Sequence, residues 1–182
     1  MTRRTFRLIA VLALFWTSTA WAADAFPDLT LPAPEDQARR AYLGLGAAPT
    51  FRLSQVKASV LIIEVFSMYC PYCQAEAPKL NDFHRRLETD AVAKGRVKII
   101  GLGVGNSAFE VNVFRDKYGV LFPLFPDEDY AVHKVLGRVR TPYFVVAALT
   151  DPKNPRVIYS QAGGVADYER FLKDLIKASG LK

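Results

Sequence analysis

The two cysteines of the chain lie in one short segment, Cys70-Pro71-Tyr72-Cys73. Two intervening residues let the sulfurs meet across the first turn of a helix, where a disulfide can form and reopen. The N-terminus of a helix also presents free N–H groups and a partial positive charge, which stabilise a thiolate, the form of cysteine that attacks disulfides. We therefore expect Cys70 to be the nucleophile and Cys73 to resolve the mixed disulfide. Pro71 suits this place, because the first helical turn does not use the N–H group that proline lacks.

Two other uses of the cysteine pair are possible in principle. A permanent structural disulfide across two residues would close a very small loop and remove little entropy from the unfolded chain. A zinc or copper site would need more ligands, because two sulfurs do not complete a tetrahedral shell. We therefore expect redox chemistry at this segment, with no metal and no cofactor.

A buried strand must position the cysteines. The continuous apolar run Val60–Phe66 directly precedes them and predicts a strand that is buried on both faces. Glu64 is the one acid in that run. Burial of an ionised carboxylate is unfavourable, so Glu64 is expected either to be protonated or to take part in chemistry. The alternative is an edge position that water reaches.

The other elements predict one α/β layered domain. Clear strands are expected over Val97–Val104 and Tyr143–Ala148, and weaker ones over Leu121–Phe125 and Arg156–Ser160. Helices are expected after the cysteines (apolar positions Ala77, Leu80, Phe83 and Leu87), after the capping pair Ser107 and Glu110, over Asp129–Leu136, and from the cap Asp167 through Ile176. Before the domain, Leu29 and Leu31 alternate as in a short edge strand, and Gln37–Leu45 is expected to form one or two helical turns.

The amino-terminal sequence predicts a secretory signal peptide over residues 1–22. Three arginines precede the apolar run Leu8–Trp16, and Ala20 and Ala22 form a small-residue cleavage site. The apolar run is shorter than the ~20 residues of a spanning helix, which disfavours the alternative of a retained anchor. Thr2-Arg3-Arg4-Thr5-Phe6 resembles a twin-arginine export signal, but we favour a generic basic head for the ordinary secretory route. Export would place the cysteines in an oxidising compartment, the periplasm.

Composition excludes several classes of protein. The chain has 182 residues, of which 51% are hydrophobic and 23% charged, so it can bury a core and is not a disordered chain. Its net charge is +6, but removal of residues 1–22 would take away three of the 24 basic residues, against 18 acidic ones. No dense basic run remains, so nucleic-acid binding is not expected.

The segment Phe66–Pro78 resembles the active-site stretch of the thioredoxin superfamily, and within it the secreted TlpA/ResA-like thiol–disulfide oxidoreductases. In element order the resemblance covers about Phe51 to Ala178. It implies a thioredoxin-like α/β fold, with a central mixed sheet flanked by helices and an extra strand–helix insertion before the last hairpin. The expected organisation is a signal peptide at 1–22, an N-terminal extension at 23–50 and a thioredoxin-like domain at 51–182.

Three further matches carry this resemblance. Glu64 lies six residues before the first cysteine, where the family keeps an acid, which implies proton exchange with Cys73. Pro78 matches the family's helix-kinking proline. Thr141-Pro142 matches its cis-proline loop, which implies that the Thr141 backbone lies beside the sulfurs and pairs with an extended substrate, with an ordinary trans proline as the alternative.

The residues that border the nucleophile are expected to contact substrate, and they also depart from the family pattern. Tyr69, Pro71, Tyr72 and Thr141 are the substrate-binding candidates, beside the catalytic set Cys70, Cys73, Glu64 and Pro142. Tyr69 stands where the family usually has Trp. The Cys-Pro-Tyr-Cys sequence is shared with glutaredoxins and one periplasmic isomerase type, and Thr before the proline also occurs among isomerases. The direction of exchange, whether reduction, oxidation or isomerisation, therefore stays open.

The resulting hypothesis is a periplasmic thiol–disulfide oxidoreductase that acts as a monomer on client proteins and is recycled by a membrane redox partner. A peroxiredoxin-like peroxidase is the first alternative; Ser67 fits its motif, but Ile63 stands where that motif needs proline. A Sco-like copper-handling module is the second, although such proteins use a three-residue spacer between the cysteines. The two histidines are expected to be structural: His84 half-buried and hydrogen-bonded, and His133 at a solvated helix position.

Overall fold

The computed structural model describes residues 26–151 and 154–182, so the predicted signal peptide lies outside the described residues. In chain order the elements are β1 (Thr30–Pro32), α1 (Gln37–Leu43), β2 (Thr50–Arg52), a 3-10 turn (Leu53–Gln55), β3 (Val60–Phe66), α2 (Pro71–Leu87), β4 (Val97–Val104), α3 (Ala108–Tyr118), β5 (Leu124–Asp127), α4 (Ala131–Val135), β6 (Tyr143–Ala148), β7 (Arg156–Ala162) and α5 (Tyr168–Ser179). Within the described ranges, no helix is long and apolar enough to cross a membrane.

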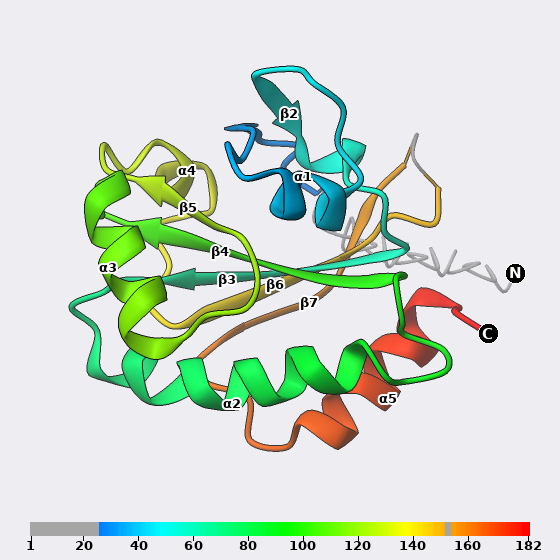
Figure 1. Ribbon diagram of the computed structural model, residues 1–182. Coiled ribbons are helices and arrows are strands. Elements are labelled where there is room, and N and C mark those ends of the chain that lie inside the picture. Colours follow the sequence, from blue (N-terminus) through cyan, green and yellow to red (C-terminus); the bar gives the residue numbers. More distant parts are fainter. Residues whose placement is uncertain (1–25, 152–153) are drawn as a thin grey trace, which may run out of the picture.

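A five-stranded mixed sheet forms the centre of the molecule, in the order β5-β4-β3-β6-β7 (Figure 1). β3, β4 and β5 run parallel, whereas β6 and β7 are antiparallel to their neighbours. β3 lies at the middle of the sheet, and all seven of its residues are buried. The prediction of a central mixed sheet flanked by helices is therefore confirmed.

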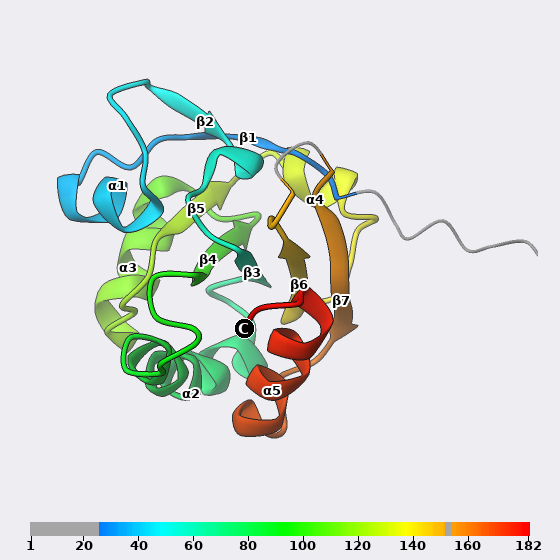
Figure 2. The same ribbon diagram turned by 90° about the vertical axis from the view of Figure 1, so that its right-hand side faces the viewer.

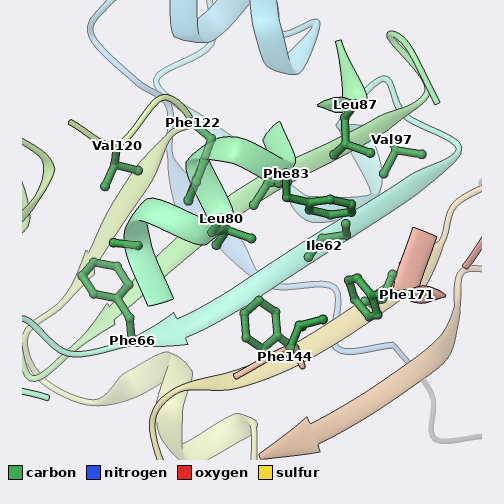
Figure 3. Close-up of a cluster of buried hydrophobic side chains, with 14 of the residues drawn as sticks. Ile62, Phe66, Leu80, Phe83, Leu87, Val97, Val120, Phe122, Phe144 and Phe171 are labelled. Carbon is green, nitrogen blue, oxygen red and sulfur yellow. The ribbon is translucent and has the colours of Figure 1, made fainter. Parts of the chain in front are cut away.

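One face of the sheet is covered by α2, α3 and α5. Alternate residues of β3 point to this face, and Ile62 and Phe66 join the same buried cluster as Leu80 and Phe83 of α2. Phe171 of α5 completes it (Figure 3). Since side chains alternate along a strand, Glu64 must point to this face as well.

The other face is covered by the amino-terminal segment and α4. Leu31, Leu43 and Phe51 are buried in one cluster with Leu61 and Ile63 of β3. Figure 2 shows this segment above the sheet, opposite α2 and α5. The residues predicted to form an extension are thus, from Phe26 onward, part of the domain core; β1 and β2 pair with each other in a small antiparallel sheet.

The strand–helix insertion is present as β5 and α4, but both begin later than predicted. β5 starts at Leu124 because Pro123 has no N–H group for the sheet, although its carbonyl accepts from Gly101 N at 2.9 Å. α4 is anchored by Asp127, whose two carboxylate oxygens accept the N–H groups of Val132 and His133, both at 2.9 Å.

Close packing around Gly101 of β4 gives a stability prediction. A Cβ at this position would lie 2.4 Å from Leu124 Cδ2 and 3.1 Å from the Phe66 ring. Gly101→Ala should therefore lower the free energy of unfolding by roughly 1–3 kcal/mol, as measured by urea denaturation. Gly46→Ala is the matched control, because a Cβ there meets nothing within 4 Å and should change stability by less than about 1 kcal/mol. Equal losses in the two variants would contradict the packing argument.

Candidate active site

The sulfur of Cys70 lies at the start of α2, at the end of the sheet where β3 stops. Cys70 is the N-cap residue, and its Sγ accepts the N–H of Cys73 at 3.4 Å. Pro71 is the first residue of the helix, as predicted. The thiol of Cys70 also lies 3.4 Å from the carbonyl oxygen of Thr141, to which it can donate. Both cysteines are free thiols in this structure.

The loop before Cys70 is held at three points. The N–H of Met68 donates to Asn106 Oδ1 at 2.8 Å, and its carbonyl accepts from Gln74 Nε2 at 2.8 Å. The hydroxyl of Tyr69 donates to Glu110, which also completes the capping box of α3. The sequence predicts the capping role of Glu110, but nothing local to Asn106 or Glu110 indicates that they reach the active-site loop.

The cis-proline loop lies beside the cysteines. The Thr141–Pro142 peptide bond is cis, which confirms the prediction of its geometry. β6 begins at Tyr143 and pairs antiparallel with β3, with Tyr143 opposite Val65, so this loop and the Cys70 loop share one end of the sheet. On its other side, the N–H of Gly163 donates to the Pro142 carbonyl at 2.8 Å.

The two thiols have opposite environments. Partial burial acts to raise the pKa of Cys70, but hydrogen bonds from the side chains of Cys73 and Thr141 and from the N–H groups of Cys73 and Tyr72 bring that pKa below its ordinary value. Cys73 is fully buried. Burial raises its pKa strongly, with further increases from the hydrogen bond to Cys70 and from the charge of Glu64. Cys70 is thus the thiol that ionises first.

Glu64 is buried beneath the cysteines, with only 1% of its surface exposed. Burial, followed by the charges of Glu76 and Cys70, raises the pKa of Glu64 to about 8. Its Oε1 atom has no hydrogen-bond partner within the described part of the chain. The alternative of a water-exposed edge position is therefore wrong, and the carboxyl is a group that can hold or release a proton near neutral pH.

Glu76 is a second buried carboxylate, which is not among the site residues predicted from the sequence. It lies on α2, one turn after Cys73, and accepts the N–H of Val165 at 2.9 Å and the hydroxyl of Tyr168 at 2.8 Å. Lys79 Nζ lies 3.3 Å away. These contacts join α2 to the start of α5, and a Cβ on Gly164 would come within 2.4 Å of the same carboxylate. Its helical spacing from Cys73 was the available signal, since that spacing places it on the buried face.

Two exposed aromatic side chains flank Cys70 in the chain. Tyr69 is 66% exposed and Tyr72 is 77% exposed. His84 is half-buried, as predicted, but its Nε2 atom has no hydrogen-bond partner in residues 26–151 and 154–182. His133, predicted at a solvated position, is also half-buried, and its Nε2 lies 2.8 Å from the Val139 carbonyl. Among the described residues, no group of three or more His, Cys, Asp or Glu side chains could hold a metal ion.

The sequence is similar to those of known thioredoxin-like proteins. A sequence model of the AhpC/TSA family matches residues 22–159, more than half of the chain. The thiol–disulfide oxidoreductase ResA of Oceanobacillus iheyensis is 24% identical over 124 residues, which make up 67% of this chain and 58% of that protein. The matched region therefore spans little more than half of the relative's length.

Solved structures show the same fold. A thiol:disulfide interchange protein DsbE of Chlorobium tepidum superposes with a TM-score of 0.62 at 18% identity, over 87% of this chain and 97% of that one. A secreted disulfide oxidoreductase of Mycobacterium tuberculosis superposes with a TM-score of 0.53 at 16% identity, over 72% and 90% of the two chains. The thioredoxin-like fold predicted from the sequence is confirmed by these likenesses.

The burial of Glu64 predicts how stability depends on pH. Its folded pKa is raised from an ordinary 4.5 to about 8, so the folded state holds this proton more tightly than the unfolded state. The resulting destabilisation is absent below the ordinary pKa, grows as the pH rises toward 8 and then stays constant. Wild-type protein should therefore lose stability relative to Glu64→Gln over that range, by an amount on the order of a few kcal/mol, since a tenfold change in proton affinity is about 1.4 kcal/mol.

Chemical denaturation at a series of pH values measures this difference. Glu128→Gln serves as the control, because Glu128 is exposed and its curve should run parallel to that of the wild type. Parallel curves for wild type and Glu64→Gln would show instead that the Glu64 carboxyl is solvated.

Proposed function

The chain belongs to the AhpC/TSA family of thioredoxin-like proteins, and because it is also similar to the thiol–disulfide oxidoreductase ResA, we propose that it is an extracytoplasmic protein thiol–disulfide oxidoreductase. The observation that carries the proposal is the asymmetry of the two thiols. Cys70 is partly exposed and ionises below the ordinary pKa of a cysteine, whereas Cys73 is buried and keeps its proton. A nucleophilic thiol and a resolving thiol need this difference.

The reaction proceeds in two exchanges. The Cys70 thiolate attacks one sulfur of a client disulfide; a Cys70–client bond forms, the client disulfide breaks, and the second client sulfur leaves as a thiolate that takes up a proton. Cys73 then attacks Sγ of Cys70, so that the Cys70–Cys73 disulfide forms and the client leaves with both sulfurs reduced. Two electrons pass from the cysteine pair to the client, and the reverse sequence oxidises a client dithiol.

Glu64 supports the second exchange in this proposal. Cys73 must lose its proton to attack, although burial raises its pKa. Glu64 interacts with the charges of both cysteines. Because its pKa is about 8, the ionised form, which is the minor form near neutral pH and grows as the pH rises, can accept the Cys73 proton. Glu76 contributes indirectly, because its charge adds to the rise in the pKa of Glu64.

Client polypeptides are the proposed substrates. Tyr69, Pro71 and Tyr72 flank the partly exposed Cys70 and are themselves exposed, so they can contact apolar side chains beside a client cysteine. The Thr141 backbone borders the same sulfur at 3.4 Å and begins the loop into β6, so an extended client segment can pair with it. Pro142, whose carbonyl accepts from Gly163 N at 2.8 Å, follows Thr141 in this loop.

The proposed location is the periplasm. Support comes from the signal-peptide pattern of residues 1–22, although they lie outside the described residues, and from the fold shared with a secreted disulfide oxidoreductase. Outside the cytoplasm, turnover requires a partner that restores the redox state of the cysteine pair, and we propose that a membrane protein does so. We further propose that the protein acts as a monomer and needs no cofactor.

Mixed-disulfide trapping tests the assigned roles. Cys73→Ser should accumulate a covalent adduct with a disulfide-containing client peptide, because nothing resolves the bond to Cys70. Cys70→Ser should give little adduct, since the remaining thiol is buried and protonated. Mass spectrometry measures both adducts, and equal trapping would overturn the assignment. Rapid consumption of hydrogen peroxide by the wild type, without disulfide exchange, would favour the peroxidase alternative.

The reduction potential of the Cys70–Cys73 couple is a separate prediction. Hydrogen bonds to the Cys70 thiolate stabilise the dithiol form relative to the disulfide and so raise the potential. We expect a value between those of thioredoxin, about −270 mV, and of a strong oxidant, about −120 mV. Equilibration with glutathione buffers measures it. A value well below the thioredoxin end would favour a dedicated reductase.

A further inference from the structure

The short helix α4 leads directly into the cis-proline loop, and it is fixed to the sheet at its start. Asp127, the last residue of β5, is buried, and its carboxylate accepts the N–H groups of Val132 and His133. Its carbonyl also accepts from Gly105 N at 2.9 Å, which ties this corner to the end of β4. The beginning of α4 is therefore held in a defined position, and Figure 1 shows it at the end of the sheet where β3 and β4 stop.

His133 links this fixed helix to the loop that follows it. Its Nε2 atom lies 2.8 Å from the carbonyl oxygen of Val139. A carbonyl oxygen only accepts, so Nε2 must carry the proton and donate. The N–H of Arg138 returns a bond to the His133 carbonyl at 2.9 Å. The chain turns tightly between His133 and Val139, where Gly137 and Arg138 have φ angles of +81° and +57°.

The loop held by His133 is the one that presents Thr141 to the nucleophile. Val139 lies two residues before Thr141, whose carbonyl oxygen is 3.4 Å from the sulfur of Cys70. Immediately after it, Pro142 is held by the N–H of Gly163. Thr141 thus lies between two anchors, one from α4 and one from the end of β7.

We propose that His133 is a positioning residue for the thiol chemistry, which fixes Thr141 against Cys70 through its hydrogen bond to Val139. This inference rests on the proposed oxidoreductase function. The property that His133 affects directly is the ionisation of the Cys70 thiol. His133 does not touch the reacting atoms; it acts through the backbone of the loop.

The position of Thr141 matters because this residue interacts with the thiolate. Burial acts to raise the pKa of Cys70, and the hydrogen bond from the Thr141 side chain is among the contacts that lower it. The Thr141 carbonyl, 3.4 Å from the sulfur, accepts from the neutral thiol and so opposes this effect, but S–H is a weak donor, whereas a hydrogen bond to a charged sulfur is strong. Hydrogen bonds weaken steeply with distance and angle, so a loop that drifts by a few tenths of an ångström would stabilise the thiolate less. Without the His133 tether, Cys70 should therefore ionise at higher pH.

The experiment compares two substitutions of His133. Leucine fills similar space but cannot donate, whereas glutamine carries an amide N–H group at a similar reach. In His133→Leu, the pH midpoint of Cys70 alkylation by iodoacetamide should rise by roughly one pH unit, the size expected when a hydrogen bond to a charged sulfur is weakened. Disulfide exchange at neutral pH should fall about threefold, since a thiolate of higher pKa is scarcer but more nucleophilic. His133→Gln should stay close to the wild type in both measurements.

Arg40→Met is the matched control for loss of a loop tether. Arg40 Nη1 donates to the carbonyl oxygens of Gly46 at 2.8 Å and Ala48 at 3.0 Å, in a loop of the amino-terminal segment. This variant should leave the Cys70 midpoint unchanged even where it lowers stability. An unchanged midpoint in His133→Leu, or equal shifts in the leucine and glutamine variants, would overturn the proposal.

The tautomer of His133 in the wild type tests the hydrogen bond to Val139 directly, and this test does not depend on whether His133→Leu folds. Long-range ¹H–¹⁵N NMR in mildly alkaline buffer should show the His133 proton on Nε2, and a proton on Nδ1 alone would overturn the proposal. Alkylation needs no client, so a failed tether and a failed oxidoreductase function give different results. The expected alkylation midpoints without any disulfide exchange by the wild type would count against the proposed function. An unchanged midpoint in His133→Leu, with active exchange by the wild type, would count against the role of His133.

Discussion

The N–H of Cys73 reaches the sulfur of Cys70 at 3.4 Å, and this contact connects a charge on the nucleophile to the first turn of α2. For the contact to exist, the chain must leave β3 and enter α2 within four residues, at an end of the sheet that solvent reaches. β3 is buried along its whole length between β4 and β6. Pairing with these two strands fixes its register in the sheet and therefore the place where it ends. The cis-proline loop then meets the same sulfur, since β6 begins beside the end of β3.

Two carboxyl groups, Glu64 and Glu76, lie buried on the same side of the sheet, but they differ in their hydrogen-bond partners. Glu76 has donors from Val165, Tyr168 and Lys79, so burial leaves its oxygens well satisfied. Glu64 has an oxygen without a partner among the described residues, and burial, followed by the charges of Glu76 and Cys70, raises its pKa to about 8. The hydrogen-bonded carboxylate of Glu76 stabilises the junction of two helices. The carboxyl of Glu64, which lacks a partner at one oxygen, destabilises the fold but can exchange a proton during the reaction.

Features set by local pattern could be predicted from the sequence, and features set by distant contacts could not. β3, β4 and β6 have the predicted bounds because buried strands are continuous apolar runs. The redox helix and the cis-proline bond follow from a motif and a resemblance, and the burial of Glu64 follows from its neighbours. Asn106, Glu76 and His133 escaped prediction because their partners lie far along the chain or on a loop without regular pattern. The sequence predicts the short strand at Leu31 and the helix α1 of the amino-terminal segment, but not the packing of this segment on the sheet, because its apolar residues are widely spaced.

The packing of that segment has a consequence for the order of folding. The cluster beneath it joins Leu31 and Phe51 to Val145 and Ala147, so its contacts close only after most of the chain is available. Such long sequence separations slow the completion of a core. The cysteine pair, by contrast, is closed by a two-residue spacer and has no other cysteine in the chain to pair with. Oxidation of the nascent protein can therefore yield only one intramolecular disulfide, however late the second face of the sheet is covered.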